Sequence, residues 1–263
     1  MPVATRAVSA VFLGTACLLA APVATAQERS ASNIQIAHGW DHSEPGISVD
    51  VPKSMFTFEN MTVGGWGSSY LFVDFIRSWS EADTNAKEVY AEWYPSLSLR
   101  KISGKQPSTG FLRDVSATVG LSTGVRSTGP APFAVVPGVT FDLKVPGFTF
   151  VSVGTYAFID RGQFQGQPTG CRGTTYQVTP SWSLPMKMGA LAMSFDGFVD
   201  FIGSHADCKA MVITQPQLRV DISRLWHKPG KVYLGVEWDF WHNKYGIEGL
   251  RDNLWLPLFV WKI

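Results

Sequence analysis

The sequence carries little charge for its length. Of its 263 residues, 16% are Asp, Glu, Lys or Arg, against about 25% in typical soluble domains. Neither a basic patch nor an acidic run is present, which argues against a nucleic-acid-binding protein and against an acidic disordered tail. No long apolar run follows the N-terminus, which excludes a helical membrane protein. Yet 45% of the residues are hydrophobic and the mean hydropathy is +0.05, so apolar side chains must be interleaved with polar ones.

The first 26 residues have the pattern of a cleaved secretory signal peptide. Arg6 is their one charged residue, an apolar stretch follows at 7–21, and residues 24–26 read Ala-Thr-Ala, a small-x-small cleavage site. We expect cleavage before Gln27, which leaves a mature chain (27–263) of 237 residues with 21 basic and 21 acidic side chains. The alternative for this segment is a short transmembrane anchor.

Two cysteines remain in the mature chain, Cys171 and Cys208. Because exported proteins meet an oxidising compartment, the pair predicts one disulfide. A zinc site needs more ligands at suitable spacing, and the five histidines are scattered, so we expect no metal and no cofactor. Neighbouring Ser and His residues at 42–43 and 204–205 point to opposite faces of a strand, and no Walker or dinucleotide-binding glycine pattern occurs. We therefore expect that the protein is not an enzyme.

Apolar and polar residues alternate almost throughout the mature chain. In 88–100, for example, apolar side chains fall on one face, and Tyr90, Glu92 and Tyr94 fall on the other. Such segments run about ten residues, the length that a tilted transmembrane strand needs. The pattern predicts an all-β fold, a single closed antiparallel transmembrane β-barrel of about twelve strands. The expected strands are 33–38, 53–60, 68–77, 88–100, 115–125, 133–143, 148–160, 176–182, 191–201, 212–222, 232–240 and 253–263.

A soluble sandwich also alternates, but its solvated face is usually rich in Lys and Glu, whereas here the polar faces carry sparse charge and aromatic rings. The last strand, 253–263, alternates aromatic and apolar residues to the chain end, as outer-membrane barrels commonly do, although Ile263 stands where Phe is usual. A soluble periplasmic barrel or sandwich remains the alternative. Five prolines count against unbroken strands, since proline removes a ladder hydrogen bond, and we expect local bulges or bends at several of them. They are Pro95, Pro137, Pro180, Pro216 and Pro257.

The connections test this topology independently. An even-stranded barrel places both chain ends in the periplasm, with short inner turns and longer outer loops. The turns at 146–147 and 185–189 are short and fall on the inner side, whereas 102–113 is a long inner exception. Both cysteines fall on the outer side, so a disulfide could join two outer loops. The longer outer loops are expected at 40–52, 78–87, 161–172 and 243–251.

Several runs of the chain resemble the nucleoside-specific channel-forming outer-membrane proteins, the Tsx-like family. They cover most of the mature chain in order. One of them, AEWYPSLSLRKI, resembles a strand of the family that keeps a proline at the place of Pro95, which eases the objection to a proline at that position. The resemblance implies a monomeric barrel of roughly twelve strands that passes nucleosides and deoxynucleosides. The chain departs from the family in ending at Ile263 and in its cysteine pair, which the family does not require. The other runs are NIQIAHGWD, MFTFENMTVGGWGSSYLFVDFIRS, VPGVTFDLKVPGFTFVSVGTYAFIDRG and GTTYQVTPSWSLPMKMGALAMSFDGFVDFIGSH.

The inward face offers the groups that bind a nucleoside. Aromatic rings stack on the base at ~1–3 kcal/mol per base, carboxylates accept hydrogen bonds from ribose hydroxyls, and Arg donates to base carbonyls. The alternative for each residue is a structural ion pair or a space-filling ring. Arg126 and Lys144 are expected to balance the acids. The lumen candidates are Tyr70, Phe72, Asp74, Tyr90, Glu92, Tyr94, Arg100, Asp196, Phe198, Asp200, Arg219, Glu237, Asp239 and Trp241.

The alternation pattern and the Tsx-like resemblance together predict a passive channel in the bacterial outer membrane, and the resemblance implies that it is selective for nucleosides and deoxynucleosides. Its expected partners are nucleosides as solutes, outer-membrane lipid and the outer-membrane assembly machinery; we expect a monomer that binds no nucleic acid. The alternatives are a channel for other small solutes, and a non-conducting or enzymatic outer-membrane barrel. Single-channel conductance separates these classes.

Overall fold

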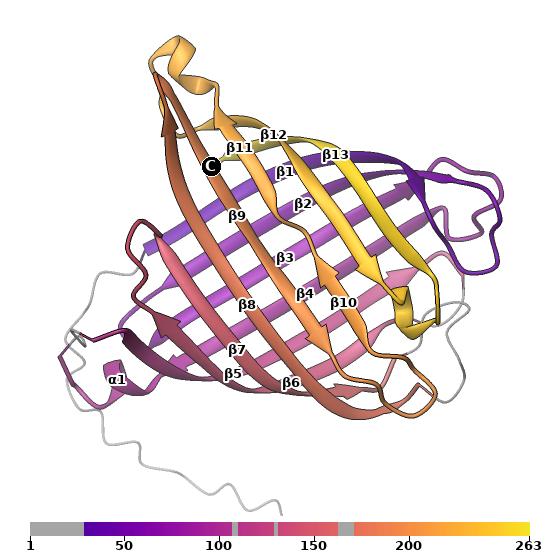
Figure 1. Ribbon diagram of the computed structural model, residues 1–263, viewed down its shortest axis with the longest axis horizontal. Helices are drawn as coiled ribbons and strands as arrows, with labels where there is room; N and C mark the ends of the chain where they lie inside the picture. Colours follow the sequence, from indigo (N-terminus) through magenta and orange to yellow (C-terminus); the bar gives the residue numbers. More distant parts are fainter. Residues whose placement is uncertain (1–28, 107–109, 129–130, 163–170) are drawn as a thin grey trace, which may run out of the picture.

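The computed structural model describes residues 29–106, 110–128, 131–162 and 171–263. The expected signal peptide, 1–26, lies outside the described residues. Within them, thirteen strands form one antiparallel sheet that closes on itself, because β13 pairs with both β1 and β12 (Figure 1). The strands are β1 (Arg29–His42), β2 (Val51–Val63), β3 (Gly67–Ser78), β4 (Lys87–Ser98), β5 (Leu112–Arg126), β6 (Phe133–Leu143), β7 (Phe150–Asp160), β8 (Gly173–Met188), β9 (Leu191–Ile202), β10 (Met211–Thr214), β11 (Gln217–Asp221), β12 (Val232–His242) and β13 (Arg251–Lys262).

The barrel wall has twelve positions, as the alternation predicts. The expected strand 212–222 is interrupted at Gln215 and Pro216, and its two pieces, β10 and β11, both lie between β9 and β12. The described parts of the connections contain three short helices: α1 (Leu99–Ile102), η1 (Ser223–Trp226) and η2 (Lys244–Gly246). None of the described helices has the length and apolar character needed to cross a membrane.

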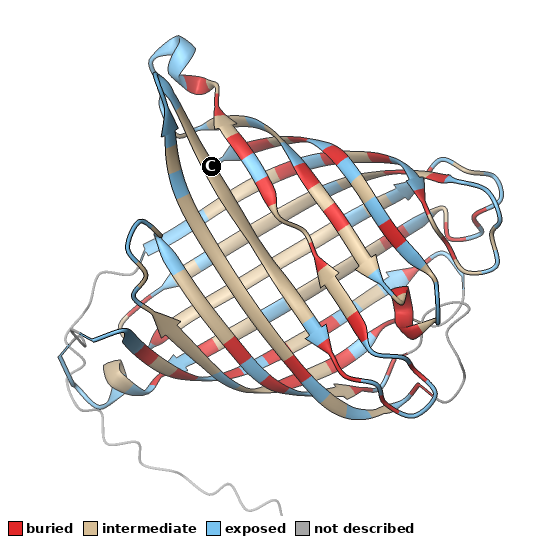
Figure 2. Cartoon of the chain, viewed as in Figure 1, coloured by how far each residue is buried: buried red, intermediate tan, exposed pale blue. Residues whose placement is uncertain are grey.

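The side chains alternate between the lumen and the exterior, with polar groups inside. In β5, Ser116, Thr118 and Ser122 are buried, whereas Val119 and Val125 are 46% and 69% exposed. Figure 2 shows the same alternation of buried and exposed positions along other strands. This arrangement inverts that of a soluble protein and suits an apolar lipid phase outside. The fold is therefore a transmembrane β-barrel of the outer-membrane type.

The prolines do not produce the bulges that we expected. Across Pro95, Pro137 and Pro180 the pairing is interrupted on one side, yet the strands keep the same register before and after the gap. The same holds at Pro216, where the pairing of β10 with β9 stops at Thr214 and that of β11 resumes in the same register. The expectation of bulges was wrong, because a strand can lose ladder hydrogen bonds without gaining a residue. The two register shifts among the described pairs lie at 39–42 and 112–114.

The connections fall at the two ends in the expected order. We call the end that holds Arg29 and Lys262 the inner end, and the opposite end the outer end. The outer end carries the connections 43–50, 79–86, 127–132, 161–172, 203–210 and 243–250. The inner end carries 64–66, 99–111, 144–149, 189–190 and 222–231, and the break at 215–216 lies within the wall. The expected turn at 185–189 is shorter than predicted, because β8 continues through Met188.

The long inner connection contains α1, which corrects one site assignment. The strand that we expected to reach Arg100 ends at Ser98, whose hydroxyl accepts a hydrogen bond from Lys101 N at 3.0 Å and caps α1. Arg100 therefore lies on α1 at the inner rim, with its guanidinium 3.7 Å from the carboxylate of Asp114, and is not part of the lumen wall. Polar capping by Ser98 overrides the strand alternation at this point.

Candidate functional site

The register of β2, β3 and β4 brings the predicted aromatic and acidic residues together in the lumen. Phe72 lies opposite Glu92, Asp74 opposite Tyr90, and Tyr70 opposite Tyr94. The ring centroids of Phe72 are 6.0 Å from Tyr70 and 5.9 Å from Tyr90, within the range of aromatic contact. These strands thus carry a continuous row of rings with carboxylates between them.

Each carboxylate in this row accepts a hydrogen bond from a neighbouring hydroxyl. Tyr70 donates to Glu59 at 3.0 Å, Thr57 donates to Asp74 at 2.5 Å, and Tyr90 donates to Glu92. Among the described residues, none of these three carboxylates takes part in a salt bridge. Asn33 also donates to Glu59, and Ser122 also donates to Glu92. A carboxylate has about four lone-pair sites, so each can accept a further donor from the lumen.

The opposite wall repeats the pattern with β8 and β9. Asp200 accepts hydrogen bonds from Thr179 at 2.5 Å and from Gln177 at 3.1 Å. Phe198 precedes it on the same lumen face of β9, since alternate strand residues share a face. Two separate parts of the wall thus place a ring beside a hydrogen-bonded carboxylate.

One lumen cavity is lined by residues of both walls. Its volume is about 190 Å³, smaller than the ~300–1,000 Å³ of a typical small-molecule site. Gln177 and Gln215 supply amide groups to its lining. Eight of the predicted residues line this cavity: Phe72, Asp74, Tyr90, Glu92, Phe198, Asp200, Asp239 and Trp241. The predicted set is therefore largely a spatial cluster.

Three predicted residues belong to a separate polar network. The amide of Gln217 donates to Gln35 at 3.0 Å and to Glu237 at 2.5 Å, and Arg219 Nε donates to Gln217 at 2.6 Å. Arg219 also lies 3.6 Å from the carboxylate of Asp196. The chain of contacts joins β1 to β11 across the two strands that lie between them in the wall, β13 and β12. The side chains of Asp196, Arg219 and Glu237 are thus held by contacts with other residues of the barrel wall.

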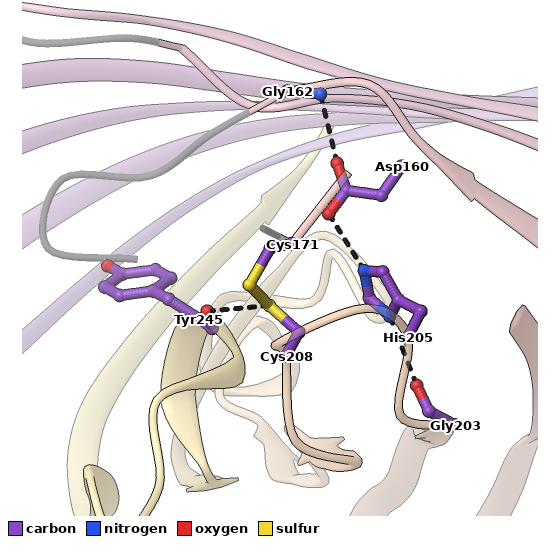
Figure 3. Close-up of a disulfide and its surroundings, with 7 residues drawn as sticks. All are labelled: Asp160, Gly162, Cys171, Gly203, His205, Cys208 and Tyr245. Atoms are coloured by element: carbon purple, nitrogen blue, oxygen red, sulfur yellow. Dashed lines mark hydrogen bonds and ion pairs between the residues drawn. A yellow bond between two sulfur atoms is a disulfide. The ribbon is translucent and has the colours of Figure 1, made fainter. Parts of the chain in front are cut away.

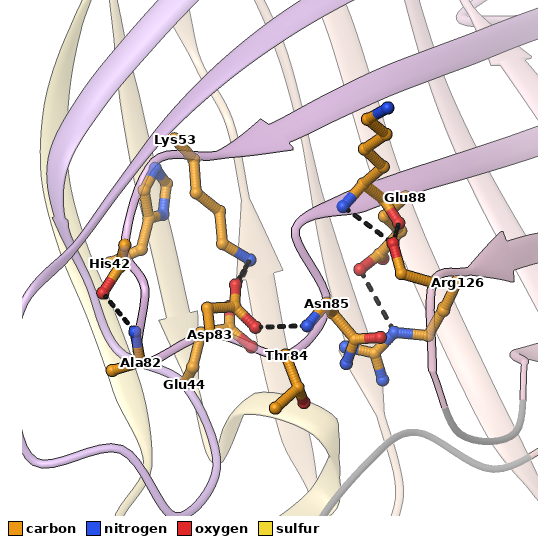
Figure 4. A network of polar contacts seen from close by, with 12 residues as sticks. His42, Glu44, Lys53, Ala82, Asp83, Thr84, Asn85, Glu88 and Arg126 are labelled. Atoms are coloured by element: carbon orange, nitrogen blue, oxygen red, sulfur yellow. Dashed lines mark hydrogen bonds and ion pairs between the residues drawn. The ribbon is translucent and has the colours of Figure 1, made fainter.

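A buried ionic cluster lies at the outer end of the lumen. The ammonium of Lys244 lies 2.9 Å from Glu44 and 2.7 Å from Asp252, and that of Lys53 lies 2.6 Å from Glu44. Burial opposes the charge of Glu44, but Lys244 and Lys53 outweigh it and hold the pKa of Glu44 below its usual value. Asp83 lies 3.9 Å from Lys53 (Figure 4). The cluster ties the outer connections 43–50, 79–86 and 243–250 to the barrel mouth.

The segment 243–250 folds inward over this mouth. Tyr245 has a φ of 60°, an unfavourable backbone conformation for a bulky residue, and its side chain is 5% exposed. Its ring packs edge-on against Trp241 at 4.8 Å. Gly246 also has positive φ, and a Cβ at this position would collide with the sulfur of Cys208. The outer connections are therefore packed against each other and partly cover the lumen.

The predicted disulfide between Cys171 and Cys208 is present. It joins the connections 161–172 and 203–210 at the outer end, as the topology predicted (Figure 3). Beside it, His205 Nε2 lies 3.2 Å from Asp160, whose other oxygen accepts from Gly162 N at 3.0 Å. The hydrogen bond with Asp160 raises the pKa of His205 above its usual value. The disulfide and this pair together fix the outer loops.

His42, Asp239 and Asp252 bring three potential metal-ligating atoms within 4.8 Å of one another. The scattered histidines gave no sign of this grouping in the sequence. The Lys244 ammonium lies 2.7 Å from Asp252 and already supplies positive charge there. We therefore interpret the grouping as part of the ionic cluster.

Two groups of site residues were missed by the sequence analysis for different reasons. Tyr156 shares the lumen face of β7, its ring lies 6.1 Å from Tyr94, and its hydroxyl lies 2.9 Å from Thr140; the alternation of that strand could have identified it. Lys244 and Tyr245 lie in a connection without periodicity, so no sequence signal pointed to them.

Comparison with known proteins gives the family. The chain belongs to the family described as "Domain of unknown function (DUF5020)", whose model matches residues 31–258. No curated protein matches the sequence.

Similar solved structures are also barrels. The KdgM porin in complex with disordered oligogalacturonate is 10% identical, with a TM-score of 0.45, and the match covers 88% of this chain and 97% of that chain. The NanC porin is 10% identical, with a TM-score of 0.44 and coverages of 87% and 97%. The translocator domain of the autotransporter NalP from Neisseria meningitidis is 14% identical, with a TM-score of 0.40 and coverages of 89% and 86%. The assignment of the fold rests on the strand pairing of this chain itself.

Proposed function

We propose that this protein is an outer-membrane channel selective for nucleosides and deoxynucleosides. The observation that carries the proposal is the convergence of Phe72, Tyr90 and Phe198 on one lumen cavity. The carboxylates of Asp74, Glu92 and Asp200 line the same cavity. The Tsx-like resemblance of the sequence supports the same substrate class.

The chemistry of the cavity suits an uncharged solute with an aromatic base and a hydroxyl-bearing sugar. The rings offer stacking surfaces, worth ~1–3 kcal/mol per base. Asp74, Glu92 and Asp200 accept hydrogen bonds from hydroxyl groups. Several weak contacts serve a channel better than one tight site, because the solute must also leave. No step of covalent chemistry is needed, and we propose a passive, non-enzymatic role.

The small volume of the cavity limits how a solute can pass through the barrel. A volume of about 190 Å³ leaves little free space beside a bound solute, so we expect a nucleoside to occlude the pore while it passes. The inward segment around Tyr245 lines the cavity at its outer end. We propose that this segment moves aside when a solute enters. We further propose that the barrel acts as a monomer, inserted by the outer-membrane assembly machinery.

The test is single-channel conductance of the refolded mature protein in a planar bilayer, titrated with adenosine, thymidine and a neutral sugar. Saturable block by the nucleosides but not by the sugar is the expected result. Block by sugar alone would favour a channel for hydroxyl-rich solutes, in which the carboxylates act without the rings. Absence of conductance from folded protein would overturn the channel proposal and favour a closed barrel.

A further inference from the structure

Two rows of outward-facing side chains cross β3, β4 and β5 near the outer end. The row further from the outer end is apolar, because Phe75 lies opposite Val89 and Val89 lies opposite Val125. One step further toward the outer end, Arg77 lies directly opposite Lys87. The change from an apolar to a cationic row is where the hydrocarbon of a membrane should give way to headgroups.

The cationic pair is unusual for a bare protein surface. Like charges directly opposite each other on an antiparallel sheet are destabilising. Arg77 and Lys87 are both exposed, and neither takes part in a salt bridge among the described residues. An anion placed between them would relieve the repulsion.

The neighbouring side chains hold Arg77 in place. Its guanidinium lies over the ring of Trp79, 5.1 Å from the centroid, a cation–π distance. The indole N–H of Trp79 in turn donates to the hydroxyl of Ser54 at 2.9 Å. Arg77 is therefore oriented before any ligand binds, which reduces the entropy lost on binding.

A groove of about 500 Å³ runs between the two rows. Phe75, Val89 and Val125 line its side toward the inner end, and Arg77 and Lys87 line its side toward the outer end. Phe75 and Val125 are 48% and 69% exposed. The groove thus has an apolar part on the lipid-facing wall and a cationic part at headgroup level.

We propose that this groove binds a phosphorylated lipid of the leaflet at the outer end. A phosphate monoester carries about −1.5 to −2 charges at neutral pH, which complements the two cations. The Arg77 guanidinium offers two parallel N–H donors to the phosphate oxygens, and Lys87 adds a compact positive charge. The acyl chain lies along Phe75, Val89 and Val125. The commitment to a lipid follows from this apolar floor, since a soluble phosphate would not use it.

The test is native mass spectrometry of the full mature barrel in detergent, titrated with lipid A, a phosphorylated acylated disaccharide. We expect one bound lipid in the wild type. In the double variant Arg77→Gln/Lys87→Gln we expect binding about thirtyfold weaker, since each of the two cations near a membrane surface is worth roughly 1 kcal/mol. The matched control is Lys187→Gln/Lys228→Gln, which removes two exposed cations from the inner end and should leave binding unchanged. Each variant is first checked for a folded, heat-modifiable band on a gel.

Further measurements separate a lipid from a soluble phosphate and locate the bound lipid. Inorganic phosphate and dephosphorylated lipid A should each bind much more weakly than lipid A. Val125→Ser should weaken the binding of lipid A but not that of inorganic phosphate. Quenching or shift of Trp79 fluorescence on lipid addition, lost in Trp79→Phe, reports binding at this site. Equal binding by the double variant and the wild type, or by phosphorylated and dephosphorylated lipid, would overturn the proposal. Equal affinity for inorganic phosphate would reduce the site to a soluble-anion site and overturn the lipid assignment.

Discussion

The hydroxyl of Thr214 donates a 2.5 Å hydrogen bond to the backbone carbonyl of Phe198. Thr214 is the last residue of β10, and Phe198 lies opposite the break at Gln215 and Pro216. Proline has no N–H to donate to the neighbouring strand. A side-chain donor therefore replaces part of the ladder at the point where the barrel wall is interrupted, next to a ring of the proposed solute path.

We expect Thr214→Val to destabilise the barrel by about 1 kcal/mol, the net worth of a typical hydrogen bond, here to a partly buried acceptor. Valine has nearly the shape of threonine, so packing should change little. Thr214→Ser retains the hydroxyl and is the control. Denaturant unfolding in lipid vesicles measures the difference, and equal stability of the Val and Ser variants would show that the hydrogen bond is unimportant.

Removal of a lumen ring should weaken block by nucleosides. For Phe198→Ala or Tyr90→Ala we expect a loss of about 1 kcal/mol or more of binding energy, roughly fivefold or more in the blocking concentration. Conductance of small ions should persist. Phe201→Ala is the control, because Phe201 lies on β9 but faces outward and is 44% exposed. Unchanged nucleoside block in both lumen variants would contradict the stacking role.

Lys244→Met should disrupt the barrel mouth. The change leaves Glu44 and Asp252 buried without the ammonium that lies 2.9 and 2.7 Å from them, and breaking a buried pair in this way costs ~3–5 kcal/mol. We expect faster hydrogen exchange in 243–250 and more frequent open events in conductance recordings. Lys209→Met is the control, because its partner Glu248 is highly exposed and such pairs contribute ~0–1 kcal/mol. Similar exchange in the two variants would argue against the ionic cluster as the structural tie.

The Cys171→Ser/Cys208→Ser variant should fold into the same barrel with reduced stability. The cysteines are 37 residues apart, and constraint of a loop of this length in the unfolded chain is worth about 3–4 kcal/mol in the chain-entropy model. The strand pairs do not depend on the disulfide, so the heat-modifiable band should remain. Loss of that band would mean that the disulfide is needed for folding itself.

The pair of His205 and Asp160 should make the outer loops sensitive to pH. The folded pKa of His205 is raised above its ordinary value of 6.5. The stabilisation is therefore fully present below about pH 6.5 and is lost as the pH rises through the raised pKa. Hydrogen exchange at Gly162 and Cys208, corrected for intrinsic rates, should show declining protection over this window. In His205→Asn the decline should vanish; an identical pH profile in that variant would refute the role of His205.

The sequence predicted the barrel well because its signal is local. Alternation along each strand states which residues share a face, whatever the neighbouring strands are. The twelve wall positions, the lumen face of Tyr90 and Phe198, and the outer side of both cysteines followed from this rule. The alternation rule failed at Arg100, because capping by Ser98 ended the strand two residues early. The rule also gave no information on the register at the prolines, because alternation does not distinguish a missing hydrogen bond from a bulge.

Which residues meet across the barrel depended on the tertiary structure. Gln35 and Gln217 are 182 positions apart in the sequence, and no pattern along the chain relates them. Lys244 and Tyr245 reach the lumen from a connection without periodicity, where backbone direction is set by packing against Trp241 and Cys208. By itself, then, the sequence determined the strand faces and the chemistry that they carry. Barrel closure and loop packing decided which of those groups share one cavity, because register and loop contacts are long-range and are fixed when the strands pair.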